Sequence, residues 1–172
     1  RHGWQTTTGS EELFVTSTPV QRFRPSRTGH AVLDLLDQSR GCLAEAASAT
    51  TATQRFAAAH LAALRAGAAV LAARARSEAA GAGGSRRARS RGPRSVWAVL
   101  AEVAPELTEW AGCFAAGAAK RAAAEAGLPH AVTTREADDL LRDAEAFLAL
   151  VCAHLGLPHQ EPLSGAVARL AG

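Results

Sequence analysis

Residues 133–158 read TTREADDLLRDAEAFLALVCAHLGLP and carry the clearest structural signal in the chain. Thr133 and Glu136 have the spacing of a capping box, in which each side chain binds a backbone N–H group at the start of a helix. Apolar residues then recur at the three- and four-residue spacing of a helix with one buried face, at Leu140, Leu141, Ala144, Phe147, Leu148, Val151 and Leu155. Gly156 and Pro158 end this pattern. The stretch therefore predicts an amphipathic α-helix, which needs other helices to cover its apolar face.

The rest of the chain shows the same helical period. Apolar stripes predict a first helix over residues 30–49 and a second that ends near Arg76. Ser95 is a suitable N-cap for a short helix, and a further helix is expected to stop at Gly127. The connections after the first and fourth helices are short, which favours antiparallel neighbours. We therefore expect an all-α fold, a four-to-five-helix up-and-down bundle with no strands in its core.

The length of 172 residues is that of one domain, and composition divides the chain into a helical body and less ordered segments. Residues 1–29 are rich in Thr, Ser, Gly, Pro and Arg and are expected to form a disordered tail. The helical bundle is expected to span residues 30–157, with a flexible Arg-rich loop over residues 81–94 inside it. Residues 158–172 are expected to form a C-terminal tail.

Alanine occupies 42 of the 172 positions, and it gathers on one side of the second predicted helix. The small residues on that side are Ala58, Ala62, Ala66, Ala69 and Ala73. Such a face allows another helix to approach closely, and we expect the chain to use small-residue faces to form a homodimer. No run of eighteen apolar residues is free of charge, so we expect no membrane-spanning helix. The three scattered cysteines show no C-x-x-C pair, which favours a reducing, cytoplasmic location.

The formal net charge of +3 is unevenly distributed. Residues 86–94 carry five Arg and no acidic residue, and the tail is also basic, so the helical body is mildly acidic. A flexible Arg-rich segment can neutralise phosphates and bind RNA or DNA without sequence preference. The candidate nucleic-acid-binding residues are Arg86, Arg87, Arg89, Arg91 and Arg94. The alternative is a solvated insertion without a binding role, because no aromatic residue is interleaved to stack on a base.

One short segment, RFAAAH at residues 55–60, places an Arg and a His at R-x4-H spacing. Residues 55–75 look like the long early helix of the HEPN superfamily (higher eukaryote and prokaryote nucleotide-binding domain), and residues 134–155 look like its last helix. Trp97, together with APELTEW at residues 104–110, is similar to a branch of that superfamily found in high-GC bacteria. The chain thus resembles the HEPN group of small helical bundles.

This resemblance, which covers roughly residues 30–157, implies a function. Many HEPN proteins are metal-independent endoribonucleases, usually dimeric, and are often encoded beside nucleotidyltransferases. By resemblance Arg55 would steady the charge on the scissile phosphate, and His60 would move the proton of the attacking or leaving oxygen. No cofactor and no metal ion is implied.

The residues themselves leave a second interpretation of this pair open. Five residues along an α-helix correspond to about 140° around its axis, so Arg55 and His60 do not share a face. A catalytic site would require a distorted helix or a second protomer that converges on the first. Alternatively, His60 is a packing residue on an Ala-rich helix.

Three further patterns have structural explanations that we favour over functional ones. Cys152, His154 and His159 suggest a metal site, but a helix break lies between the two histidines, and we expect no metal. Trp97 and Trp110 suit a hydrophobic core better than a nucleotide platform. The acidic residues of the last helix are expected to form a solvated face. They are Asp138, Asp139, Asp143 and Glu145.

Two functions follow from these observations. The first is a cytoplasmic, dimeric HEPN-type protein that binds RNA or a nucleotide, either as an endoribonuclease or as its inactive relative. The second is a non-catalytic helical interaction module that docks a protein partner such as a nucleotidyltransferase. The position of Arg55 relative to His60 in the folded protein is the observation that bears most directly on the first.

Overall fold

The computed structural model describes residues 27–80, 94–128 and 130–158, and these form five α-helices and one short 3₁₀ turn, with no strand among them. The elements in chain order are α1 (Arg27–Ser48), α2 (Ala52–Ala80), α3 (Val96–Val103), η2 (Pro105–Leu107), α4 (Thr108–Glu125) and α5 (Thr134–His154). The predicted all-α fold is confirmed. Two boundaries differ from expectation, since α1 begins at Arg27 within the predicted tail and α2 continues to Ala80. The α2 pattern meets no glycine or proline between Gly67 and Gly81, so nothing in the sequence stops it at Arg76.

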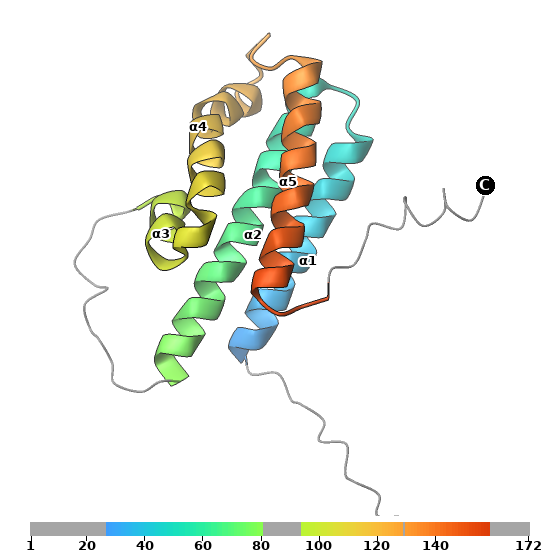
Figure 1. Ribbon diagram of the computed structural model, residues 1–172. Helices are drawn as coiled ribbons and strands as arrows, with labels where there is room; N and C mark the ends of the chain where they lie inside the picture. The colour runs from blue at the N-terminus through green and yellow to red at the C-terminus, as the bar shows by residue number, and fades with distance from the viewer. Residues whose placement is uncertain (1–26, 81–93, 129, 159–172) are drawn as a thin grey trace, which may run out of the picture.

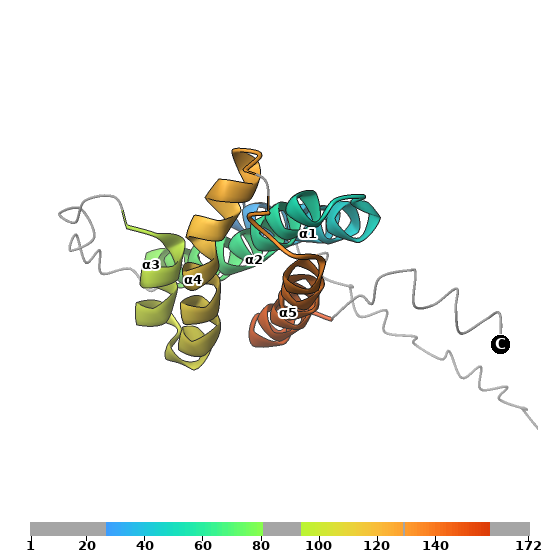
Figure 2. The ribbon, with the colours of Figure 1, turned by 90° about the horizontal axis from the view of Figure 1, so that it is seen from above.

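Helix α2 lies at the centre of the bundle (Figures 1 and 2). Its most extensive packing is against α1, and α5, α4 and α3 pack around its remaining faces. The chain reverses direction between α1 and α2, and α5 runs beside both (Figure 1). The short connection after the first helix therefore produces the antiparallel pair that its length predicts.

The small-residue face of α2 lies inside the protomer. Its five alanines are all buried, with at most 9% of any of them exposed. Helix α1 covers this face, because Ser39 Oγ donates a hydrogen bond of 2.8 Å to the carbonyl oxygen of Ala62. On the same side, Arg65 Nη1 donates to the carbonyl oxygen of Gln38 at 3.3 Å. The predicted close helix approach therefore occurs between α1 and α2, and this alanine face is not available to a second copy of the chain.

An aromatic cluster fills the space between α2, α3, α4 and α5. Phe114 lies at its centre, with its ring centroid 5.2 Å from those of Trp97 and Phe147 and 6.0 Å from that of Trp110. Phe114 and Phe147 are fully buried, and only 5% of Trp97 is exposed. Large aromatic side chains contribute most to core stability because each buries a large apolar area. Trp97 is therefore a core residue, as predicted.

Local signals position the start of α5 and the end of α4 as the sequence predicts. Thr133 Oγ1 accepts a hydrogen bond from the Glu136 backbone N–H at 3.2 Å, and Glu136 Oε2 accepts one from the Thr133 backbone N–H at 2.9 Å. This is the predicted capping box. At the other boundary, Gly127 adopts a φ of 71°, a left-handed conformation that glycine takes without strain and that ends α4.

Judged by length and composition alone, the span Ala52–Ala79 of α2 is long and apolar enough to cross a membrane. Other helices of the bundle bury 61% of its most apolar window. The central helix of a bundle has this character because it must be apolar on several sides. The span is therefore accounted for by its position in the fold.

Candidate functional site

Arg55 lies in the first turn of α2, where it connects three helices. Its Nη1 forms an ion pair of 2.7 Å with Oδ1 of Asp138 on α5. Its Nη2 donates a hydrogen bond of 3.0 Å to the carbonyl oxygen of Ala49, which follows the end of α1. The guanidinium group therefore holds the connection between α1 and α2 against α5.

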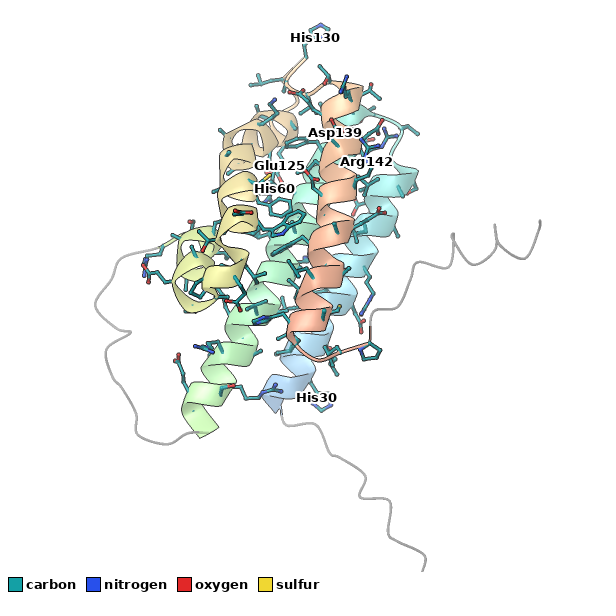
Figure 3. The ribbon with its side chains drawn as sticks, in the orientation of Figure 1. His30, His60, Glu125, His130, Asp139 and Arg142 are labelled. Carbon is teal, nitrogen blue, oxygen red and sulfur yellow. The ribbon has the colours of Figure 1, made fainter. Side chains whose placement is uncertain are left out.

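His60 lies in the middle of the bundle, one helical turn after Phe56 (Figure 3), and only 1% of it is exposed. Its Nε2 is 2.8 Å from the carbonyl oxygen of Phe114 on α4. A carbonyl oxygen only accepts hydrogen bonds, so Nε2 carries a proton and donates it. The other ring nitrogen, Nδ1, is buried and has no hydrogen-bond partner among the described residues. Burial lowers the pKa of His60 below its ordinary value of 6.5, which the Phe114 carbonyl only partly opposes.

The structure does not bring Arg55 and His60 together. Arg55 is directed to α5 and to the end of α1, whereas His60 is directed to α4 and lies edge-on to the rings of Trp97 and Phe114. Helix α2 continues unbroken through both positions. Each side chain thus has a structural role within one protomer, and the catalytic role that the resemblance implies stays a prediction.

The buried His60 predicts a dependence of stability on pH. Because its pKa is lowered in the folded state, the unfolded chain binds the proton first as the pH falls. We expect the free energy of unfolding to decrease as the pH falls below 6.5, by up to about 1.4 kcal/mol per pH unit. Urea unfolding between about pH 7.5 and about pH 5 measures this slope.

A His60→Gln variant is the control, because its amide still donates to the Phe114 carbonyl but does not titrate. It should lose most of this pH dependence, and an equal slope in both proteins would contradict the prediction. Glu136 does not interfere in this window. The hydrogen bond from Lys120, and to a smaller extent those from Thr133, lower the pKa of Glu136 from 4.5 to about 2. The stability that Glu136 contributes is therefore lost only as the pH falls below 4.5 towards 2.

Of the five arginines predicted to contact nucleic acid, the structure describes only Arg94. Its Nη1 forms a hydrogen bond of 2.8 Å with Oε2 of Glu102 on α3, and its other terminal nitrogen contacts the same carboxylate. This contact raises the pKa of Arg94. The remaining four, Arg86, Arg87, Arg89 and Arg91, lie outside the described residues. The nucleic-acid interface stays a prediction, and Arg94 is already paired with a carboxylate.

A shallow pocket of about 300 Å³ opens between α4 and α5. Phe56, Gly117 and Leu140 are among its apolar lining residues, and Lys120 and Asp143 are among its polar ones. Gly117 allows α4 to lie close to α2, because a Cβ atom at this position would be 3.3 Å from His60 Cδ2. The buried histidine therefore lies directly beneath one wall of this pocket.

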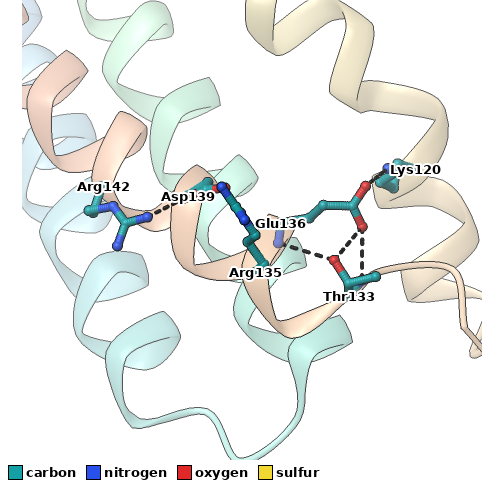
Figure 4. Close-up of polar contacts among 6 residues, drawn as sticks. All are labelled: Lys120, Thr133, Arg135, Glu136, Asp139 and Arg142. Carbon is teal, nitrogen blue, oxygen red and sulfur yellow. Dashed lines mark hydrogen bonds and ion pairs between the residues drawn. The ribbon is translucent and has the colours of Figure 1, made fainter.

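Charged side chains form pairs around the pocket (Figure 4). Lys120 on α4 contacts Glu136, whose carboxylate also accepts the hydrogen bonds of the capping box. Asp139 contacts Arg142 and, at 3.8 Å, Arg135 on its own helix. Lys120 is the only lysine of the chain, and here it joins α4 to the start of α5.

The acidic residues of α5 are accessible to solvent, with the side chains of Asp138 and Asp139 45% and 49% exposed, but they divide between two sides of the helix. Asp138 faces α2 and pairs with Arg55, while Asp139 and Asp143 line the pocket beside α4. Only Glu145 is simply exposed. Adjacent positions on a helix are about 100° apart, so this acidic run is distributed around the axis.

The described residues contain no group of three or more side chains suited to hold a metal ion. His154 Nδ1 lies 3.1 Å from a Glu106 carboxylate oxygen, and Cys152 is buried beside Arg40. The third member of the metal interpretation, His159, lies outside the described residues. The side chains present therefore form ordinary polar contacts between helices.

Two partners in these contacts were missed by sequence reasoning, Asp138 and Lys120. Each is a charged residue whose partner is distant in sequence, and Arg55 and Asp138 are separated by 83 positions. The sequence holds one weak indication of the Arg55–Asp138 contact. Asp138 directly follows the buried Ala137 and so lies near the boundary of the buried face of α5.

Comparison with known proteins supports the resemblance. A model of an HEPN-like domain family matches residues 46–152, which is more than half of the chain and runs from the end of α1 almost to the end of α5. No curated protein and no solved structure matches the chain. The matched region includes the central helix α2, the aromatic cluster and both walls of the pocket. The chain therefore belongs to the HEPN family of helical domains.

Proposed function

We propose that this HEPN-domain protein is a non-catalytic helical interaction module that docks a protein partner and does not cleave RNA. The main support for this proposal is that both residues of the R-x4-H pair, Arg55 and His60, make contacts that hold helices of the same protomer together. His60 is 1% exposed and bonded to a backbone carbonyl, and Arg55 is paired with Asp138. A general acid or base must reach the proton that it transfers, and a histidine buried in this way does not reach a phosphodiester.

The charge of the helices also favours a protein partner over a polyanion. Helix α5 carries five carboxylates and two arginines, and α4 carries equal numbers of acidic and basic residues. An acidic surface repels phosphates and attracts basic proteins. By family resemblance the partner class is a nucleotidyltransferase, and a cytoplasmic location is part of this proposal.

The absence of ribonuclease activity is tested with three proteins. We expect wild type, Arg55→Ala and His60→Gln to leave a mixed-sequence RNA equally intact over the same incubation, because neither residue contacts substrate. Gel electrophoresis of labelled RNA gives the readout, and circular dichroism verifies that each variant is folded. Cleavage by wild type that both folded variants lose would contradict the proposal.

RNA binding by the Arg-rich segment is the second candidate function, which the five arginines of residues 86–94 support. Deletion of residues 82–94 tests it. If this segment binds RNA, the deletion should abolish RNA affinity together with its dependence on salt concentration. Affinity that persists unchanged would exclude the segment as the binding element.

A homodimer remains part of the proposal. Because α1 covers the alanine face of α2, a dimer must use another surface, and the exposed small residues of α4 offer one. Light scattering of the purified protein measures the mass directly. A monomeric mass at all concentrations would contradict the dimer and, with it, a catalytic site shared between two protomers.

A further inference from the structure

Helix α4 is held unevenly along its length. Its first half, residues 108–117, packs Trp110 and the fully buried Phe114 into the aromatic cluster. Its second half, residues 118–125, reads AAKRAAAE and contains no apolar side chain larger than that of alanine. In this half only Ala124 is buried. We call residues 118–125 the α4 end segment, and little hydrophobic burial holds it to the bundle.

One ion pair joins the α4 end segment to another helix within the described residues. Lys120 contacts the carboxylate of Glu136 at the start of α5 (Figure 4). The other ion pair, Arg121–Glu125 at 2.8 Å, lies inside the segment and does not attach it to the bundle. Leu128, beyond the end of α4, is 54% exposed and adds no anchor. The Lys120–Glu136 contact is therefore the main polar attachment of this segment.

Gly117 marks the boundary between the two halves of α4. Glycine in a helix interior is unfavourable relative to alanine, because it loses more backbone entropy when it is ordered. A Cβ atom here would lie 3.3 Å from His60 Cδ2 and 3.8 Å from Phe56 Cζ, so α4 lies close to α2 at this point. A locally weak point of the helix therefore lies where its well-packed half ends.

His60, which lies against Gly117, adds a cost to the closed arrangement. Its Nε2 donates to the Phe114 carbonyl, but its Nδ1 is buried and has no hydrogen-bond partner among the described residues. A buried acceptor without a donor is unfavourable, and the cost is relieved when water reaches the ring. Movement of α4 beyond Gly117 uncovers one edge of this ring. The unsatisfied nitrogen therefore favours a state in which the α4 end segment has moved away.

We propose that the α4 end segment is a lid that opens from Gly117 by local unfolding and is held closed by the Lys120–Glu136 ion pair. This inference concerns a motion of the fold and does not depend on the proposed docking function. A detached helix this short is marginal in water, so the segment unfolds when it leaves the bundle. The first half of α4 stays in place because Phe114 anchors it. The open state exposes Phe56 and His60, which the closed state buries.

Hydrogen exchange of the full chain, resolved by mass spectrometry of its peptides, measures the opening directly. In native buffer, where global unfolding contributes little, the amides of residues 118–125 should exchange together. They should exchange at least about tenfold faster than those of residues 112–117, because opening spares the anchored half. Rates that rise only gradually towards the helix end would indicate fraying and would overturn the lid. Equal protection of both halves would also overturn it.

The role of the ion pair is tested by variants that remove its charges. Lys120→Met keeps the length of the side chain, and Glu136→Gln keeps the capping interaction because Gln also serves in a capping box. Each should speed exchange of residues 118–125 about two- to fivefold, the effect of a partly exposed ion pair, and leave residues 112–117 unchanged. The double variant should exchange no faster than either single one, because both changes remove the same contact. Additive effects, or no effect, would contradict the proposed role of this pair.

Arg142→Met is the matched control for Lys120→Met. It removes a cation that is paired with Asp139 within α5 and does not touch α4. Exchange of the α4 end segment in this variant should equal that of wild type. Equal acceleration in Arg142→Met and Lys120→Met would show a general effect of charge removal and would overturn the specific role of Lys120–Glu136.

A second measurement tests whether opening reaches the buried histidine. Diethyl pyrocarbonate acylates accessible imidazole nitrogens, and peptide mass spectrometry separates His60 from exposed histidines such as His130. His60 should react slowly in wild type and about two- to fivefold faster in Lys120→Met, in step with exchange of the α4 end segment. Labelling of His60 that follows global unfolding alone, without a response to Lys120→Met, would overturn the proposal.

Discussion

A Phe114→Ala variant is expected to lose about 3–5 kcal/mol of unfolding free energy, the cost of removing a fully buried aromatic ring. Phe114 is 0% exposed and lies between the rings of Trp97, Trp110 and Phe147. Its removal leaves a cavity among rigid neighbours, which cannot collapse to fill it. Small domains have a total stability of about 5–15 kcal/mol, so this loss is a large share. Urea unfolding monitored by tryptophan fluorescence measures it.

Leu128→Ala provides the matched control, because this side chain is 54% exposed beyond the end of α4. Its unfolding free energy should change by no more than about 0.5 kcal/mol. The Phe114 carbonyl still accepts the hydrogen bond of His60 in the Ala variant, so the loss reports packing alone. Similar small losses in both variants would show that the aromatic cluster is not the centre of the core.

An Ala62→Leu variant is expected to destabilise the bundle by about 1–3 kcal/mol through overpacking of the α1–α2 interface. Ala62 is 0% exposed, and the hydrogen bond of 2.8 Å from Ser39 Oγ to its carbonyl oxygen holds α1 close to this position, so a larger side chain must displace its neighbours. The added isopropyl group must push α1 away or adopt a strained rotamer. The midpoint of thermal unfolding, measured by circular dichroism, should fall by several degrees.

Ala122→Leu makes the same chemical change at an exposed position of α4. Alanine and leucine have similar helix propensities, so this control should leave the unfolding free energy nearly unchanged. An Ala62→Leu protein as stable as Ala122→Leu would contradict the tight packing of α1 on α2. It would also reopen the alanine face as a surface for a second copy of the chain.

The positions of the helices could be predicted from the sequence with good accuracy because their signals are local. The capping box of Thr133 and Glu136, the cap at Ser95 and the stop at Gly127 each involve residues within four positions of one another. Apolar periodicity likewise requires only the geometry of a single helix. The two misplaced ends were the start of α1 at Arg27, which has no such signal, and the end of α2 at Ala80, where Gly81 was the next stop signal along the chain.

The candidate site could be predicted only in part. Resemblance identified the HEPN family, but the R-x4-H spacing contains no information on whether the two side chains converge. His60 turned out to be a buried packing residue, the alternative that its 140° separation from Arg55 favours. The partners of the pair, Asp138 and the Phe114 carbonyl, are 83 and 54 positions away.

The sequence by itself thus determined the helical elements, their caps and the family of the chain, because backbone hydrogen bonds and caps depend on near neighbours. Only the tertiary structure decided that α1 covers the alanine face, that the R-x4-H pair is divided between α5 and α4, and that a shallow pocket opens between those two helices. Each of these results depends on which helix faces are in contact. Side-chain packing between segments that are distant in the sequence determines those contacts.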